Sequence, residues 1–166
     1  MIHDSKIILG IDPGYGRVGY GIIHKNGSTL SYGVAGCIET PKTDSSGKRL
    51  NAIYKKVSSV IRQENPTALA IEQLFFAKNT KTALRVAETR GILLLLSEEY
   101  KMPVYEFTPL QVKVAVCGYG KADKAQVQDM VARILCMAQP PQPDDAADAL
   151  AIAITATTCA MSDFAH

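Results

Sequence analysis

The sequence has no pair of cysteines spaced to bind a metal. Its 166 residues include four cysteines, Cys37, Cys117, Cys136 and Cys159, which lie far apart, and no Cys-x-x-Cys motif or cysteine–histidine cluster occurs. Scattered cysteines argue against a structural zinc site and are typical of proteins that stay reduced in the cytosol. We therefore expect a cytoplasmic protein.

Long apolar runs are also missing. The longest uninterrupted apolar stretches are only a few residues long, whereas a helix that crosses a bilayer needs about 20. The apolar stretch that follows residues 1–6 is too short for a secretory signal, which also needs a small-residue cleavage site. These absences predict a protein with no membrane contact.

No repeat, low-complexity tract or second domain is visible in the sequence. Hydrophobic residues make up 47% of the chain and charged residues 20%, which are the proportions of a folded globular protein. A length of 166 residues fits one domain. We expect a single domain over residues 1–166, with residues 160–166 frayed. The net charge of +2 by itself identifies no partner.

Turn signals divide the chain into strands and helices. Gly14 and Gly16 mark a turn, Asn26-Gly27 is typical of a two-residue hairpin, and Pro66 ends a helix. The predicted strands span residues 6–12, 18–24, 30–39, 68–72 and 103–107. The predicted helices span residues 50–61, 78–99, 110–116, 124–137 and 144–159. This order predicts an α/β protein with one mixed sheet that is covered by helices.

Two acidic residues follow the apolar cores of predicted strands. Asp12 comes directly after residues 7–11, and Glu72 comes directly after residues 68–71. An ionised carboxylate at the edge of a buried sheet is costly unless something compensates it. Either acid alone is equally well explained by a turn cap or by an ion pair with an arginine. Two such acids at the ends of two core strands favour a functional site.

Two further acids begin the last predicted helix. Asp145 and Asp148 are three residues apart, so they share one face of that helix. Helix capping is the alternative, because acids stabilise the positive end of a helix. Capping accounts well for Asp144 and partly for Asp145. The residues after Asp148 are so apolar that we expect a buried helix, which favours a functional role for Asp148.

Four carboxylates would balance the charge of two magnesium ions, which prefer oxygen ligands and keep several waters. Two ions roughly 3.5–4 Å apart can activate a water and stabilise the leaving oxygen of a phosphodiester. The four acids are therefore compatible with a two-metal phosphodiesterase. Their spacing alone leaves the capping and ion-pair alternatives open.

Longer motifs carry a resemblance to a known family. They are Gly10-Ile11-Asp12-Pro13-Gly14, Ala70-Ile71-Glu72-Gln73, Phe75 with Ala77-Lys78-Asn79, Gln111-Val112-Lys113, Gly118 and Gly120 with Lys124, and Asp145-Ala146-Ala147-Asp148-Ala149-Leu150-Ala151. In these motifs, which cover nearly the whole chain in the family's order, the sequence resembles the RuvC family of crossover junction endodeoxyribonucleases, the Holliday junction resolvases.

The resemblance implies a ribonuclease H-like fold with a five-stranded mixed sheet flanked by helices. It implies a homodimer that nicks opposing strands of a four-way DNA junction in recombination and repair, with a branch-migration motor as a partner. The family's metal ligands correspond to Asp12, Glu72, Asp145 and Asp148, which would hold two Mg²⁺ ions, with Mn²⁺ able to substitute. The apolar segment 92–96 is a candidate dimer contact, and core packing is the alternative.

The resemblance also implies contacts with DNA. Phe75 matches an aromatic residue that wedges near the junction centre, and a core aromatic is the alternative. Lys113 and Lys124 match basic positions near the DNA backbone. Lys121 lies with them on the two segments before the last predicted helix, and Lys78 extends the basic area along the long helix. Ordinary surface solvation is the alternative for such lysines.

Two other functions are weighed against junction cleavage. A strand followed by Asp12-Pro13-Gly14 and a glycine-rich hairpin also opens the actin and sugar-kinase fold, which binds ATP. That fold needs a second, duplicated domain, for which this chain is too short. A DNA-binding module without activity is the other alternative, and acids at all four positions argue against it.

Overall fold

The structure, a computed structural model, describes residues 5–14, 16–73 and 80–158. The elements in chain order are β1 (Ser5–Pro13), β2 (Arg17–Asn26), β3 (Thr29–Glu39), α1 (Ser46–Glu64), β4 (Ala68–Glu72), α2 (Thr80–Glu99), β5 (Val104–Phe107), α3 (Pro109–Cys117), α4 (Lys124–Ile134) and α5 (Asp144–Thr158). The predicted α/β class and the order of elements are confirmed.

The five strands form one mixed sheet in the order β3-β2-β1-β4-β5. β1, β2 and β3 pair antiparallel, as the Asn26-Gly27 hairpin predicts. β4 pairs parallel to β1, and β5 pairs parallel to β4. β1 therefore lies at the centre of the sheet, and its carboxyl end is at the same edge as that of β4.

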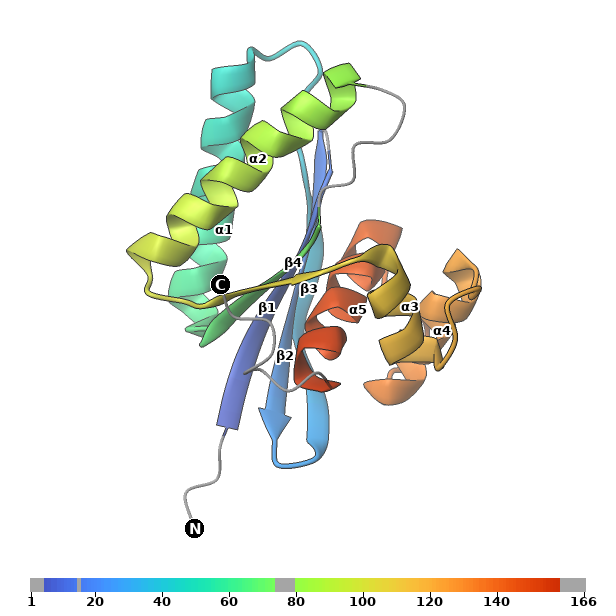
Figure 1. Ribbon diagram of the computed structural model, residues 1–166. Coiled ribbons are helices and arrows are strands. Elements are labelled where there is room, and N and C mark those ends of the chain that lie inside the picture. Colours follow the sequence, from blue (N-terminus) through green and yellow to red (C-terminus); the bar gives the residue numbers. More distant parts are fainter. Residues whose placement is uncertain (1–4, 15, 74–79, 159–166) are drawn as a thin grey trace.

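Helices cover both faces of the sheet (Figure 1). α1 and α2 lie on one face, and α3, α4 and α5 lie on the other. Side chains of β1 alternate between the two resulting cores. Ile8 packs with residues of α3, α4 and α5, whereas Leu9 and Ile11 pack with residues of α1 and α2. All three side chains are fully buried, so the strand that carries Asp12 is held from both sides.

Helix α5 lies unusually close to the sheet because glycines face it. A Cβ atom on Gly19 would lie 2.0 Å from the Asp145 carbonyl oxygen, and one on Gly10 would lie 2.1 Å from the Ala149 carbonyl oxygen. Contacts this short exclude any larger residue unless the backbone shifts. The glycines of β1 and β2 therefore set the depth of α5 and bring its first turns to the end of β1.

Local caps explain where helix bounds differ from those predicted. α1 begins about one turn earlier than predicted because Ser45 caps it, its Oγ accepting a hydrogen bond from Lys48 N at 3.4 Å. α4 begins at Lys124 as predicted, after a capping box formed by Asp123 and Gln126. α4 ends before its predicted end, and Cys136 beyond it has a φ of 52°. No helix among the described residues is long and apolar enough to cross a membrane.

Candidate active site

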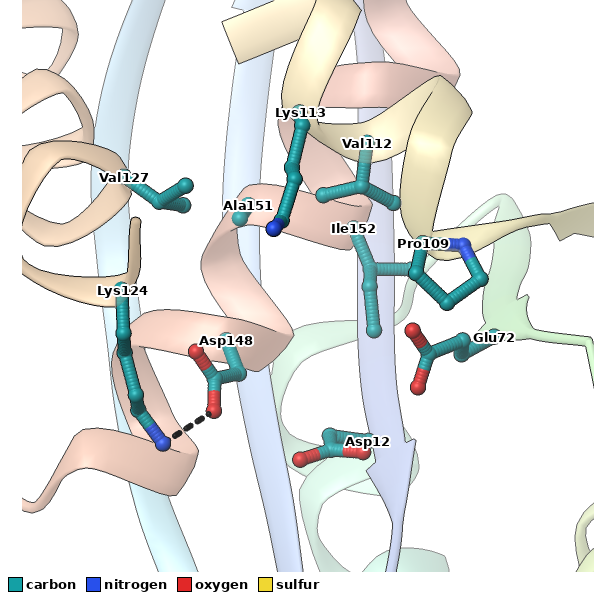
Figure 2. Close-up of a pocket in the computed structure, with 10 residues that line it drawn as sticks. All are labelled: Asp12, Glu72, Pro109, Val112, Lys113, Lys124, Val127, Asp148, Ala151 and Ile152. Carbon is teal, nitrogen blue, oxygen red and sulfur yellow. Dashed lines mark ion pairs between the residues drawn. The ribbon is translucent and has the colours of Figure 1, made fainter. Parts of the chain in front are cut away.

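Three carboxylates from three elements face one cavity. Asp12 near the end of β1, Glu72 at the end of β4 and Asp148 in α5 line a cavity of about 240 Å³. Figure 2 shows their carboxylate groups turned toward this shared space. Parallel pairing of Ile11 with Ile71 explains why Asp12 and Glu72 are neighbours. The fold thus gathers three of the four predicted acids.

Burial and nearby negative charges raise the pKa of each of the three acids. The pKa of Asp12 rises from 3.8 to about 7, first because the group is buried and then because Glu72, Asp148 and Asp145 are negative. Burial, followed by the charge of Asp148, also raises the pKa of Glu72. Burial is likewise the largest cause of the raised pKa of Asp148. Raised pKa values of this kind are typical of buried carboxylates with like charges nearby, an arrangement common at functional sites.

Lysines surround this cavity as well. Lys124 Nζ lies 3.0 Å from Asp148 Oδ2 and 2.7 Å from Asp144 Oδ2. Lys113 from α3 lines the cavity, and Figure 2 shows its amine turned toward the carboxylates. Lys121 is exposed in the turn between α3 and α4 and lies outside the lining of the cavity. The structure thus brings two of the predicted lysines to the acids.

Asp145 lies beside the cavity and forms an ion pair with Arg17. Arg17 Nη2 lies 2.7 Å from Asp145 Oδ2, and it also lies 3.6 Å from Glu39 Oε1. Asp145 lies outside the lining of the cavity, although its charge contributes to the raised pKa of Asp12. The structure therefore places Asp145 near the other acids without turning it into their shared space.

Arg17 is a site residue that sequence reasoning missed. It is the first residue of β2 and pairs in register with Glu39, directly after the Gly16 turn. This position lies at the same edge of the sheet as Asp12, because β1 and β2 pair antiparallel. A basic residue at the start of that strand was the available signal.

Apolar side chains form the rest of the cavity. They are Pro109, Val112, Val127, Ala151 and Ile152. Walls of this kind exclude water and lower the local dielectric constant, so charges inside interact more strongly than in water. Phe75 and Lys78, the other predicted DNA-binding residues, lie outside the described residues.

The donor set fits a hard divalent cation. Carboxylate oxygens are the ligands that Mg²⁺ prefers, and Asp12, Glu72 and Asp148 turn theirs toward one cavity. Among those residues, however, no three His, Cys, Asp or Glu side chains converge as a complete metal-binding group. Lys124 and Arg17 hold Asp148 and Asp145, so these two carboxylates would have to reorient to share an ion.

The five-stranded mixed sheet with helices on both faces is the ribonuclease H-like fold that the resemblance implies. The family described as "Crossover junction endodeoxyribonuclease RuvC" matches this sequence over residues 8–156. The chain belongs to the RuvC family of crossover junction endodeoxyribonucleases, which are divalent-metal nucleases. Family membership confirms the predicted resemblance and sets aside the ATP-binding alternative.

Individual relatives agree with this assignment. "Crossover junction endodeoxyribonuclease RuvC" of Thermosipho melanesiensis is 51% identical over 146 residues, which are 88% of this chain and 93% of the relative. The protein of the same name from Thermotoga maritima is 50% identical over 149 residues, which are 90% of this chain and 89% of the relative.

Solved structures show the same fold. Thermus thermophilus RuvC, in complex with Holliday junction substrate, superposes with a TM-score of 0.87 at 33% identity, covering 92% of this chain and 93% of that one. The yeast mitochondrial Holliday junction resolvase Ydc2 gives a TM-score of 0.65 at 16% identity, covering 89% of this chain and 76% of that one. At 16% identity, the likeness to Ydc2 shows only that the two proteins share a fold.

Proposed function

We propose that this chain nicks two opposing strands of a four-way DNA junction in symmetric pairs, by Mg²⁺-dependent hydrolysis of phosphodiester bonds. The observation that carries the proposal is that Asp12, Glu72 and Asp148 come from three separate elements and line one cavity. The T. thermophilus relative, solved with a Holliday junction substrate, supports the choice of substrate.

Four carboxylates would hold the metal ions: Asp12, Glu72 and Asp148 in the cavity, with Asp145 turning in from beside it. When bound, two Mg²⁺ ions supply an activated water and stabilise the leaving oxygen. Asp12 must lose its proton before it can act as a ligand, since a ligating carboxylate is ionised and the pKa of Asp12 is about 7. Metal binding and proton release are therefore linked at Asp12.

The lysines would face the DNA phosphates. Lys113 is turned into the cavity and Lys124 lies at its rim, where positive charge offsets the negative charge that builds on a reacting phosphate. Lys121 is exposed close in sequence to Lys124 and suits a contact with the DNA backbone. Phe75 and Lys78 stay predictions, with Phe75 stacking on an unpaired base of the junction.

A homodimer would carry the two nicking sites. The apolar second half of α2 divides between core and surface: Leu93 and Leu96 are buried, whereas Leu94 and Leu95 are 37% and 54% exposed. Leu84, which lies about three turns before Leu95 on the same side of α2, is 63% exposed. We infer that the exposed leucines of α2 contact a second copy of the chain, which supports the predicted dimer contact for part of that segment.

Other expectations about the whole molecule stay predictions. These are the single domain over residues 1–166, the cytoplasmic location, the branch-migration motor as a partner and the ability of Mn²⁺ to replace Mg²⁺. An inactive junction-binding module is the remaining alternative function. It shares the proposed DNA contacts and differs only in the absence of metal-dependent cleavage.

A synthetic four-way junction with labelled strands tests the proposal. The wild-type chain should produce paired, symmetric nicks with Mg²⁺ and none with EDTA. Asp12→Asn should bind the junction as tightly as the wild type and fail to nick it, because one metal ligand is lost. Asp129→Asn, which neutralises an exposed acid of α4, should cleave like the wild type. Junction binding without nicking by the wild type would favour the inactive module.

A further inference from the structure

Asp144 is an acid that the proposed metal site does not use. It begins α5 directly before Asp145, lies outside the lining of the cavity and has a half-exposed side chain. Its Oδ2 atom lies 2.7 Å from Lys124 Nζ, and its Oδ1 atom lies 3.9 Å from Arg17 Nη2. Asp144 is thus in ion-pair distance of both cations that hold the carboxylates of Asp145 and Asp148.

Lys124 is shared between a proposed ligand and this extra acid. Its ammonium lies 3.0 Å from Asp148 Oδ2, on the cavity side, and 2.7 Å from Asp144 Oδ2 on the other. Hydrogen bonds to Asp144 and then to Asp148 raise the pKa of Lys124, and the bond to Lys124 lowers the pKa of Asp144. Both partners of the Lys124–Asp144 pair are therefore firmly charged.

An ammonium and a divalent ion repel each other when both approach the same carboxylate oxygen. A metal ion that binds Asp148 Oδ2 would therefore push the Lys124 ammonium away from it, and the ammonium then needs another acceptor near the cavity. Asp144 already contacts that ammonium and lies away from the cavity. It can therefore keep Lys124 at the rim, where a DNA phosphate would arrive, without competing with the ion.

We propose that Asp144 is a positioning residue that holds Lys124 aside when Asp148 binds a divalent ion, so that the lysine neither blocks the metal nor leaves the site. This inference rests on the proposed function, because it assumes that Asp148 is a metal ligand. It predicts that Asp144 affects metal affinity through Lys124, and not through its own charge or through the helix that it begins.

Asp144 also has a structural role that the test must separate. An acid in the first turn of a helix stabilises that helix by about 0.3–1 kcal/mol through the helix dipole. A negative charge near the cavity would also attract any cation, although about 0.1 M salt screens charges that are more than roughly 10 Å apart. Neither effect requires Lys124, so a double-mutant cycle distinguishes them from the proposed role.

The experiment measures Mg²⁺ binding to the DNA-free protein by isothermal titration calorimetry in 0.1 M salt. Asp144→Asn should weaken Mg²⁺ binding roughly two- to fivefold, the range expected for a partly exposed ion pair, because Lys124 is left with Asp148 alone. In a Lys124→Gln background the same substitution should leave the affinity nearly unchanged. Asp144→Glu should restore most of the wild-type affinity.

Asp129→Asn is the matched control. It neutralises another exposed acid, on α4, without removing an ion-pair partner of Lys124 or Arg17, and should leave Mg²⁺ affinity unchanged. Equal weakening by Asp144→Asn in both backgrounds, or no weakening in the wild-type background, would overturn the inference.

The proposed function fails in a different way. If Asp12→Asn leaves Mg²⁺ binding intact, the metal does not bind in this cavity, and both the proposed site and the role of Asp144 are wrong. Asp12→Asn could instead abolish Mg²⁺ binding while Asp144→Asn has the same effect with and without Lys124. In that case only the role of Asp144 is wrong. A thermal melt of each variant verifies that it is folded at the titration temperature.

Discussion

Folding strongly raises the proton affinity of Asp12. Its pKa lies at about 7 in the folded chain against 3.8 for the free group. Between these pH values the folded state binds a proton that the unfolded state has lost. The free energy of unfolding of the metal-free protein should therefore fall as pH rises from about 4 to about 7, and the loss should be complete above that range.

Asp12→Asn should remove this component of the pH dependence, because an amide does not titrate. In EDTA, urea unfolding at pH 5, 6, 7 and 8 should show the variant gaining stability relative to the wild type as pH rises, and exceeding it at pH 8. Parallel curves for the two proteins would mean that Asp12 is not buried among like charges.

Individual residues were predictable from sequence to different degrees. Asp12 and Glu72 were found because a charge after a buried strand is costly, and Asp148 because the residues that follow it are apolar. The ion pairs of Arg17 with Asp145 and of Lys124 with Asp144 were not found. Each joins residues far apart in sequence, and the geometry that brings them together is set by how α5 docks on the sheet.

The position of α5 depends on its close approach to the sheet. A side chain at Gly19 would collide with the Asp145 carbonyl oxygen, so Gly19→Ala should push the first turn of α5 away from the sheet. Overpacking of this kind costs about 1–3 kcal/mol. We expect a lower melting temperature together with weaker Mg²⁺ binding, because Asp145 and Asp148 move with the helix.

Gly47→Ala provides the comparison for that variant. Gly47 lies in the first turn of α1, and a Cβ atom there would meet nothing within 4 Å. The alanine should therefore stabilise the protein by about 0.4–1 kcal/mol by restricting the unfolded chain. A Gly19→Ala variant as stable as Gly47→Ala would show that α5 does not depend on the close approach.

Element order was predictable because hydrophobic periodicity and turn residues are local signals. The hairpin at Asn26-Gly27 and the strand Ala68–Glu72 were predicted correctly. The start of α1 at Ser46 was missed, since it depends on the Ser45 cap and not on apolar spacing. The short distance between α5 and the sheet was missed as well, because glycines in a strand do not reveal which helix will pack on them.

At the scale of the whole molecule, the exposed leucines of α2 lead to a prediction about assembly. Leu95 is 54% exposed, and a glutamate in its place should leave the fold intact while placing a charge in the proposed dimer contact. We expect Leu95→Glu to be monomeric by light scattering coupled to size-exclusion chromatography, and to lose paired nicking while it still binds Mg²⁺.

A matched leucine on another helix makes this result interpretable. Leu110 on α3 is 61% exposed, so Leu110→Glu adds the same charge to a different surface and should stay dimeric. A dimeric Leu95→Glu variant would mean that the two copies meet elsewhere.

The position of α5 has a consequence for how the protein is made. This helix is the last described element of the chain, yet it packs on the central strands and carries two of the proposed ligands. A nascent chain that still lacks it has neither a closed core nor a complete set of acids. A chain released from the ribosome before this helix is made would therefore lack both Asp145 and Asp148, two of the four proposed metal ligands.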